Sequence, residues 1–314
     1  MNVLVTGAAG FLGTLLIKTL LSETNAGGHD VRIVAADLTR GPIDDTRVEW
    51  HAGSITDTAF IDSIAGADLD VVFHLAAVLS GQAEAEFDLG LRVNVDATRA
   101  LLEACRRLKR APRFVFSSTI AVFGGPLPEV VPEDFALMPQ SSYGAEKAIA
   151  ELLVLEYSRR GFVDAVVCRV PTVTVRPGKP NSALSSFVSG IIREPIAGLE
   201  SLCPVPLDTP IWVSSPATVT YNLLHASRIP ASALEGRRAI NLPGLSVTPG
   251  EMLDSLQRLA GPAARALVRC EVDDRVQRIF RTWPGAFEVT RALALGFRGD
   301  TDVDAIVCEY MTGT

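Results

Sequence analysis

The N-terminal segment constrains the fold of this chain more than any other part of the sequence. An apolar run, Asn2–Thr6, ends at a turn in which Gly7, Gly10 and Gly13 are spaced three apart, and a helix-like stretch, Phe11–Leu21, follows. In such a strand–turn–helix unit, backbone N–H groups at the helix N-terminus can bind an anion such as a pyrophosphate. The GxxGxxG spacing predicts a dinucleotide site, although an ordinary glycine turn at a helix start would show the same residues.

Strand-like runs rich in valine and isoleucine alternate with helical stretches through the first half of the chain. Strands that are apolar on both sides and alternate with helices form a parallel sheet that is covered on both faces. The pattern therefore predicts an α/β, Rossmann-like doubly wound parallel sheet, with ligands at the carboxyl ends of its strands. Beyond the first strand and helix, we expect strands at Val31–Ala36, Val71–Leu75, Arg113–Ser117 and Asp164–Val170, and helices at Asn94–Lys109 and Ser142–Arg160.

The pattern changes after Val170, where eight prolines between Pro171 and Pro216 favour loops and short elements. We expect residues 1–170 to form the dinucleotide-binding domain, rejoined by about residues 205–235. Residues 171–204 and 236–314 would form a smaller C-terminal substrate-binding lobe. The rejoining segment would contain a strand at Ile211–Val213 and a helix at Pro216–Ser227, and the lobe would contain helices at Thr248–Ala260, Asp273–Arg281, Phe287–Leu295 and Asp302–Met311.

Composition excludes several classes of protein. With 29 basic and 36 acidic residues the net charge is −7, so the chain lacks the basic balance of a nucleic-acid-binding protein. The five cysteines form no CxxC pair, which is typical of buried thiols in a reducing compartment, and the scattered histidines predict no metal site. The uncharged stretch Met1–Ile17 is too short and too glycine-rich for a membrane span or a signal peptide. We expect a soluble, cytoplasmic protein.

Asp37 ends the second expected strand, at the separation from the glycine turn where an acid can bind the ribose hydroxyls of an adenosine. A carboxylate at this place repels a 2′-phosphate, so NAD is favoured over NADP. Arg40 lies close enough in sequence to accept such a phosphate, and a solvated turn aspartate is the alternative interpretation of Asp37.

Tyr143 and Lys147 stand four apart near the start of an expected helix and so share one face of it. A free phenol has a pKa of about 10, which a nearby ammonium lowers and burial raises. We expect the lysine, together with the positive charge of an oxidised nicotinamide, to prevail. The pair would then be a general base that deprotonates an alcohol while hydride leaves the same carbon. Alternatively, Lys147 pairs with Glu151 and Tyr143 is a packing residue.

The order and spacing of these motifs resemble the extended short-chain dehydrogenase/reductase family across nearly the whole chain. The matching segments are Gly7–Gly13, Asp37, His74–Ala77, Asn94, Ser117–Gly124, Tyr143–Lys147 and Arg169–Val173. The resemblance implies a Rossmann-like sheet, NAD as the cofactor and a Tyr–Lys–Thr catalytic set. In that set Thr119 would be the hydroxyl member, Ser118 would lie beside the nicotinamide, and Asn94 would support Lys147 through water.

The same resemblance implies the residues that bind the cofactor. Two positions depart from the family: Gly53 is followed by Ser54 and Ile55 instead of an acid that contacts adenine, and Phe123 replaces a tyrosine that is common in nucleotide-sugar epimerases. The expected cofactor-binding residues are Gly7, Gly10, Phe11, Leu12, Gly13, Asp37, Ser54, Ile55, Leu75, Ala76, Ala77, Asn94, Ser117, Ser118, Tyr143, Lys147, Pro171 and Val173.

The second half of the chain is similar to a subgroup of this family that oxidises a four-carbon sugar acid at its C2 hydroxyl. The matching segments are Arg169–Asn181, Gly190–Pro195, Ile211–Ala217 and Trp283-Pro284. A small acid needs a carboxylate clamp, and Arg176 follows a strand where it could donate two parallel hydrogen bonds, although it could instead pair with a local acid. The expected substrate-binding residues are Ser80, Thr119, Tyr143, Arg176 and Asn181, with Arg193 a weaker candidate.

Two other functions stay open from the sequence. A nucleotide-sugar epimerase or dehydratase on the same scaffold would form no net NADH. A non-catalytic dinucleotide sensor would typically lack the Tyr143–Lys147 pair that is present here. Similarity to the family also implies a homodimer, formed through the long helices at Asn94–Lys109 and Ser142–Arg160.

Overall fold

The computed structural model describes residues 1–25, 30–66, 68–179 and 183–313, and it is built around a seven-stranded sheet. Every neighbouring pair of strands in this sheet is parallel. The strand order, β10-β6-β5-β4-β1-β2-β3, confirms the expected doubly wound fold. The strands are β1 (Asn2–Thr6), β2 (Arg32–Asp37), β3 (Val48–Ala52), β4 (Val71–His74), β5 (Arg113–Thr119), β6 (Asp164–Val170) and β10 (Ala239–Asn241).

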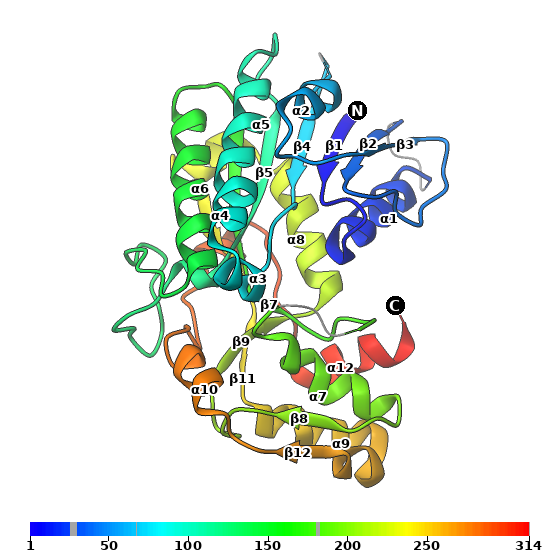
Figure 1. Cartoon of the computed structure of the whole chain (residues 1–314), viewed down its shortest axis with the longest axis vertical. Coiled ribbons are helices and arrows are strands. Elements are labelled where there is room, and N and C mark those ends of the chain that lie inside the picture. Colours follow the sequence, from blue (N-terminus) through cyan, green and yellow to red (C-terminus); the bar gives the residue numbers. More distant parts are fainter. Residues whose placement is uncertain (26–29, 67, 180–182, 314) are drawn as a thin grey trace.

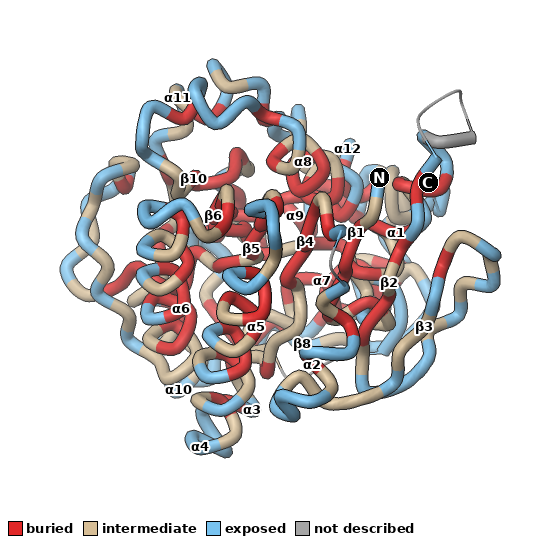
Figure 2. Tube along the Cα trace, turned by 90° about the horizontal axis from the view of Figure 1, so that it is seen from above, coloured by how far each residue is buried: buried red, intermediate tan, exposed pale blue. Residues whose placement is uncertain are grey.

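Helices cover both faces of the sheet (Figures 1 and 2). Helices α1 (Phe11–Asn25) and α8 (Pro216–Arg228) pack on one face, and α2 (Thr58–Ile64), α5 (Ala97–Arg106) and α6 (Ser142–Arg159) pack on the other. Successive residues of a strand point to opposite faces, so Val3 and Val5 of β1 join the first core and Leu4 joins the second. Because both faces are apolar, the central strands are buried on both sides.

The remaining elements form a second layer below the carboxyl ends of the sheet strands (Figure 1). This lobe has its own core, to which Val188, Met252 and Ile306 contribute from three helices. Its elements are β7 (Thr172–Val173), α7 (Ser186–Ile196), β8 (Ser201–Cys203), β9 (Ile211–Ser214), β11 (Leu245–Val247), α9 (Pro249–Ala266), β12 (Val268–Cys270), α10 (Asp274–Phe280) and α12 (Val303–Thr312). Helix α11 (Thr290–Ala294) lies beside the core of the main sheet instead. Shorter elements before β5 are α3 (Ser80–Ala85), α4 (Phe87–Gly90) and a π-helix, Leu91–Asp96.

Two strands lie in a different sheet from the one that the sequence predicts. Ile211–Val213, expected in the main sheet, belongs to β9 of a three-stranded sheet with order β11-β9-β7. Ala239–Asn241, expected in the lobe, is β10 and pairs with β6 at the edge of the main sheet. Both segments are short and apolar, so local pattern alone does not reveal which sheet edge each of them completes. The expected helix at Pro216–Ser227 does return to the main sheet as α8.

Other expectations need smaller corrections. Phe287 starts no helix: α11 spans only Thr290–Ala294, and the Phe287 ring packs against Phe123 and Trp212 where the lobe meets the sheet. Although buried thiols were expected, Cys270 and Cys308 are exposed, and all five cysteines are free.

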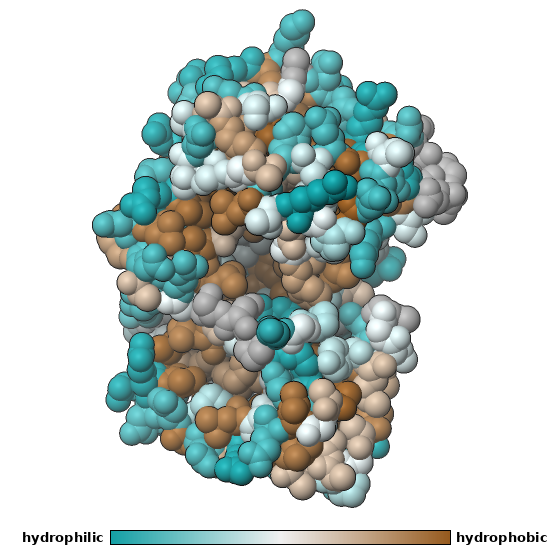
Figure 3. Space-filling view, turned by 45° about the vertical axis from the view of Figure 1, so that its right-hand side comes forward, coloured by the Kyte–Doolittle hydropathy of each residue, from teal (hydrophilic) through white to brown (hydrophobic). Residues whose placement is uncertain are grey.

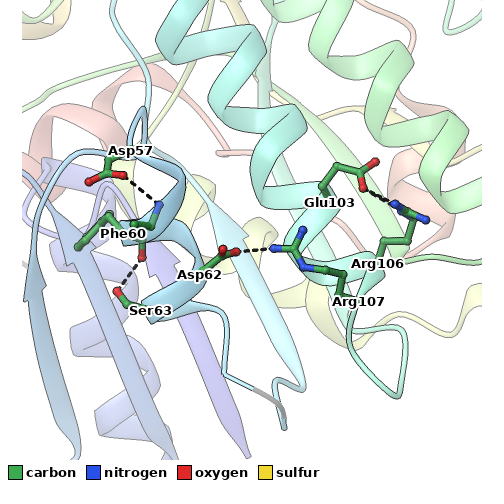
Figure 4. A network of polar contacts seen from close by, with 8 residues as sticks. Asp57, Phe60, Asp62, Ser63, Glu103, Arg106 and Arg107 are labelled. Carbon is green, nitrogen blue, oxygen red and sulfur yellow. Dashed lines mark hydrogen bonds and ion pairs between the residues drawn. The ribbon is translucent and has the colours of Figure 1, made fainter.

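A surface network joins α2 to the end of α5 (Figure 4). Asp57 caps α2 by accepting a hydrogen bond from the Ala59 N–H at 2.9 Å. Asp62 of α2 forms an ion pair with Arg107, and Arg106 binds Glu103 within α5 at 2.6 Å. Exposed ion pairs contribute about 0–1 kcal/mol each, so this network orients the ends of the helices more than it stabilises the fold.

The described residues contain neither a helix that could cross a membrane nor a cluster of side chains that could hold a metal ion. None of their helices combines the length and the apolar character that a bilayer crossing requires. No three histidine, cysteine, aspartate or glutamate side chains among them are placed to hold a metal ion together.

Candidate active site

A cavity of about 880 Å³ opens where the strand order of the main sheet reverses. β1 has β2 on one side and β4 on the other, so the segments that follow β1 and β4 leave the sheet in different directions. In open α/β sheets this arrangement leaves a crevice at the carboxyl ends of the strands, where ligands bind. Figure 3 shows the molecule hollowed between the sheet and the lobe.

The glycine turn after β1 forms one wall of the cavity. Gly7 has a φ of +71°, and a Cβ there would lie 2.7 Å from the Ala76 nitrogen of the segment that follows β4. A Cβ on Gly13 would lie 2.2 Å from the Gly7 carbonyl oxygen. Gly10 lines the cavity at the N-terminus of α1, where the first N–H groups of the helix have no intrahelical acceptor. The turn fits a pyrophosphate, because N–H groups without acceptors at a helix N-terminus bind anions and glycine lets the ligand approach the backbone closely.

Asp37 lies at the end of β2 on the rim of the cavity. Its carboxylate accepts hydrogen bonds from the Ala9 N–H at 2.9 Å and the Leu38 N–H at 2.7 Å. Arg40 pairs with Asp44 at 3.0 Å and is absent from the described residues that line the cavity. The rim therefore carries an acidic side chain at the end of β2, and its contact with the ribose of NAD stays a prediction.

Of the departures from the family pattern, Ser54 and Ile55 lie at the cavity and Phe123 does not. Ser54 and Ile55 both line the cavity, and the Ser54 hydroxyl lies 2.8 Å from the Thr56 hydroxyl, so hydroxyl and apolar groups take the place of the usual acid. Phe123 is fully buried outside the cavity lining, and the Arg169 guanidinium lies 4.9 Å from the centre of its ring.

Tyr143 and Lys147 reach the cavity from the first two turns of α6. Ser141 caps this helix by accepting a hydrogen bond from the Gly144 N–H at 3.1 Å. A Cβ on Gly144 would lie 2.2 Å from the Ala121 carbonyl oxygen, so the helix packs directly against the segment that follows β5. This close approach brings the tyrosine to the same cavity as Thr119. Lys147 is almost fully buried, with its Nζ 4.1 Å from the centre of the Phe116 ring.

Burial dominates the ionisation of this pair. It raises the pKa of Tyr143 to about 12, and the charge of Glu146 acts in the same direction. It lowers the pKa of Lys147 to about 7, against the opposing charges of Glu151 and Glu146. Within the chain alone, burial therefore outweighs the lysine, and the expected lowering of the phenol pKa, which also depends on the charge of an oxidised nicotinamide, stays a prediction. Both charged forms lose their hydration in the same enclosed site.

The three hydroxyls at the end of β5 differ in what they can do. Thr119 Oγ1 accepts a hydrogen bond from the Ala121 N–H at 3.1 Å, which leaves its own proton to donate into the cavity. Ser118 donates instead to the buried carboxylate of Glu151. Glu151 also holds an ion pair with Arg169, with Nη2 and Oε2 2.9 Å apart. The alternative pairing of Lys147 with Glu151 is thus not what the structure shows.

Asn94 lies in the π-helix and is buried next to the site, but it is not among the described residues that line the cavity. Its side chain accepts from the Val78 N–H at 2.9 Å and donates to the Val78 carbonyl at 3.0 Å and to Glu146 Oε2 at 2.6 Å. Its backbone carbonyl accepts a hydrogen bond from the Thr98 hydroxyl at 2.8 Å. Asn94 therefore anchors the segment after β4, and its support of Lys147 through water remains a prediction.

The expected substrate residues have different surroundings. Arg176 lines the cavity, and burial together with the charge of Arg193 lowers its pKa. Arg193 donates to the Arg176 carbonyl at 2.8 Å, so it holds the backbone of that residue. Ser80 lines the cavity, but its hydroxyl accepts from the Leu184 N–H at 3.2 Å. Asn181 lies outside the described residues.

The cavity also contains residues that sequence reasoning did not assign to it. Trp283 comes from the segment after α10 and Arg92 from the π-helix, and Gln82 and Ser185 complete the polar additions. Trp283-Pro284 is a distinctive dipeptide, but no local signal predicts that it folds back toward β1. The other expected cofactor residues that line the cavity are Phe11, Leu12, Leu75, Ala76, Ala77, Ser117, Pro171 and Val173. Their individual roles remain predictions.

Comparison with known proteins assigns this geometry to a family. Residues 3–226 match the model of the NAD dependent epimerase/dehydratase family. The chain belongs to this family. This confirms the expected membership in the extended short-chain dehydrogenases/reductases, with NAD as the cofactor, and the chain is an NAD-dependent dehydrogenase of that type.

Two relatives match over nearly their whole length. The chain is 51% identical to the D-erythronate dehydrogenase of Cupriavidus necator, over 99% of this chain and 98% of that protein. It is 42% identical to the D-erythronate dehydrogenase of Haemophilus influenzae, over 99% of both chains. Among solved structures, it is similar to a nucleoside-diphosphate-sugar epimerase from Agrobacterium tumefaciens, with a TM-score of 0.94 and 39% identity over 99% of this chain and 94% of that chain.

Proposed function

We propose that this enzyme oxidises the C2 hydroxyl of D-erythronate, a four-carbon sugar acid, to the 2-oxo acid with NAD as the hydride acceptor. One observation carries the proposal: Tyr143, Lys147, Thr119 and Arg176 line the same cavity as the glycine turn. A base, a hydroxyl donor and a carboxylate clamp thus share one space with the cofactor site. The names of the two full-length relatives support the choice of substrate.

The reaction removes a proton and a hydride from one alcohol carbon. Bound NAD supplies the acceptor for the hydride and a positive ring that favours the phenolate. Tyr143 Oη takes the proton of the C2 hydroxyl, the C2–H bond breaks with its electron pair, and the C=O bond forms. Lys147, as an ammonium, stabilises the phenolate and donates to the nicotinamide ribose. Thr119 donates to the reacting oxygen.

Arg176 would bind the carboxylate of the substrate. A guanidinium matches a carboxylate with two parallel hydrogen bonds, which fixes the orientation of the acid as well as its position. With the carboxylate held there, the neighbouring C2 hydroxyl is the one presented to Tyr143. Arg193 supports this arrangement because it holds the Arg176 backbone at 2.8 Å.

The name of the Agrobacterium structure favours a second candidate, a nucleotide-sugar epimerase. An epimerase returns the hydride to its product, so NADH does not accumulate during turnover. The two functions therefore differ in a directly measurable quantity.

The test is a panel of four- and five-carbon aldonates with NAD or NADP, followed at the absorbance band of NADH. We expect net NADH formation with D-erythronate and NAD, and much slower turnover with NADP. The Arg176→Lys variant keeps the positive charge but loses the two parallel donors of the guanidinium. Its KM for the acid should therefore rise by about tenfold or more. Epimerisation of UDP-sugars without activity on any aldonate would refute the proposal and select the epimerase.

We also propose that the enzyme is a cytoplasmic homodimer, paired through α5 and α6. The outer face of α6 exposes Ile149 and Leu152, the latter at 64% of its surface, and the free cysteines suit a reducing compartment. Sedimentation velocity should give a dimer for the wild type and a monomer for Leu152→Lys. A monomeric wild type would contradict the pairing.

A further inference from the structure

Cys203 and Cys270 lie opposite each other in the two-stranded sheet of the lobe. Strands β8 and β12 run parallel and side by side (Figure 1), and the register of the pair makes the two cysteines direct partners. Of the five cysteines, all within the described part of the chain, these are the only two that a strand register places opposite each other. The proposed mechanism uses neither thiol.

The two cysteine side chains point to the same face of this sheet. Partner positions of neighbouring strands share a face, and successive positions along a strand alternate. One position before the cysteines, Leu202 and Arg269 are partners and both are exposed, so they form the outer face. Two positions before Cys270, Val268 belongs to the core of the lobe. The cysteines therefore lie on the inner face with Val268.

The backbone holds the pair at a distance that a disulfide can span. The ladder continues on both sides of it, because the Ser201 N–H donates to the Leu267 carbonyl at 3.0 Å and the Glu271 N–H donates to the Cys203 carbonyl at 3.1 Å. Neighbouring strands lie about 4.8 Å apart, and disulfides join Cα atoms that are about 4.4–6.8 Å apart. A disulfide also needs Cβ atoms about 3.5–4.5 Å apart, so closing the bond draws the strands slightly together and makes it easier to reduce.

The two thiols differ in access in the way that a two-step exchange requires. Cys270 is exposed, whereas Cys203 has no exposed surface and its thiol donates a hydrogen bond to the Val205 carbonyl at 3.4 Å. Burial raises the pKa of Cys203, the nearby Cys270 adds to the rise, and the charge of Arg265 opposes it. An oxidant therefore reaches Cys270 first, and Cys203 lies next to it to complete the bond.

We propose that Cys203 and Cys270 are a redox modification site, which a small disulfide such as oxidised glutathione converts to an intramolecular disulfide. The Cys270 thiolate attacks the S–S bond of the oxidant, forms a mixed disulfide and releases one glutathione. The Cys203 thiolate then attacks the Cys270 sulfur, the mixed bond breaks, and the second glutathione leaves. The two protein thiols lose two electrons and two protons in total, and the oxidant gains them as it becomes two thiols.

Mass spectrometry of the folded enzyme tests this site without any substrate. The reduced protein is incubated with oxidised glutathione, the remaining thiols are alkylated, and the tryptic peptides are analysed. Cys203 lies in the peptide Glu194–Arg228 and Cys270 in the peptide Cys270–Arg275. We expect these two peptides to be joined, the intact protein to be about two mass units lighter than the reduced form, and dithiothreitol to reverse both changes.

Three variants separate the two steps of the exchange. Cys203→Ala keeps a small apolar side chain in the core and should stop the reaction at a glutathione adduct on Cys270. Cys270→Ser should form neither the bridge nor an adduct on Cys203. Cys308→Ser is the matched control, because it removes the other exposed thiol and should leave the bridge intact. If Cys203→Ala does not fold, Cys270→Ser, a change at an exposed position, decides.

Oxidation of the unfolded protein in urea shows whether the fold directs the bond. Without the strands, the five cysteines should give a mixture of linkages, whereas the folded protein should give one. The same mixture from the folded protein would overturn the inference. So would folded wild type in which Cys203 stays a free thiol, whether Cys270 is then reduced, carries glutathione or is joined to a second chain.

Discussion

Burial disfavours the charged forms of both Tyr143 and Lys147 on α6. The phenol needs to lose a proton and the amine needs to keep one, yet burial raises the first pKa to about 12 and lowers the second to about 7. At neutral pH the chain alone therefore holds a neutral phenol. In the proposed mechanism, the positive charge of bound NAD favours the phenolate, so we expect Tyr143 to act as a base only with the cofactor in place.

Replacing Tyr143 with phenylalanine tests this base. We expect kcat to fall by about 10²–10⁴-fold, because a positioned general base contributes that much, while the Kd for NAD changes little. In the wild type, kcat/KM should rise up to about pH 7 and then level off, because above that pH the growing phenolate fraction of Tyr143 is offset by loss of the Lys147 ammonium. Tyr157→Phe is the control: Tyr157 lies on the same helix but binds Glu103 outside the cavity lining. Near-normal turnover of Tyr143→Phe would reject the assignment.

We propose that Asp37 governs the choice between the two nicotinamide cofactors. Asp37→Asn keeps the shape of the side chain but removes the charge that repels a 2′-phosphate. We expect the preference for NAD over NADP, as a ratio of kcat/KM values, to fall by about tenfold or more. Arg40→Ala should leave the ratio unchanged, because Arg40 pairs with Asp44. An unaltered ratio in Asp37→Asn would show that selectivity arises elsewhere.

At the scale of elements, the buried ion pair between Glu151 and Arg169 joins α6 to β6. Glu151→Leu leaves a guanidinium buried without its partner, which should cost about 3–5 kcal/mol in the free energy of unfolding by urea. The double variant with Arg169→Met should recover most of that loss. Asp304→Ala breaks the exposed pair with Arg258 and should cost less than about 1 kcal/mol. Equal losses at the buried and exposed sites would contradict this account.

The elements that could be predicted are those that local pattern determines. The strands β1, β2, β4, β5 and β6 are continuous apolar runs, and α6 has both a capping serine and a terminal glycine. Val48–Ala52 was not predicted, because this edge strand is mostly polar and half exposed. The expected helix from Asn94 begins within a π-helix, Leu91–Asp96, which hydrophobic periodicity does not reveal.

For the site too, residues in local patterns could be predicted and residues brought in by tertiary packing could not. Gly7 and Tyr143 could be predicted to lie at the cavity because each belongs to a short motif, and Asp37 because it ends the strand that follows the glycine turn and its helix. Trp283 could not be predicted, since it reaches the cavity through the tertiary packing of the lobe on the sheet. Nor could the hydrogen bonds of Asn94, which link three segments of the chain.

At the scale of the whole molecule, the lobe is expected to provide substrate contacts while the sheet holds the cofactor. Trp283 is the aromatic residue that the lobe contributes to the cavity lining. Trp283→Ala should raise the KM for D-erythronate by about tenfold, because a large apolar wall is lost, and leave the Kd for NAD within about twofold. Leu199→Ala, an exposed change in the lobe outside the cavity lining, is the control. A matching loss of NAD affinity would show that the two functions are not divided in this way.

The fate of the hydrogen on C2 tests the central claim most directly. D-erythronate carrying deuterium at C2 is oxidised by the enzyme in ordinary water, and the NADH that forms is analysed by mass spectrometry. If the C2–H bond breaks with its electron pair passing to the cofactor, the NADH is one mass unit heavier and the rate falls by a primary isotope effect. Unlabelled NADH, or deuterium retained in the product, would contradict oxidation at C2.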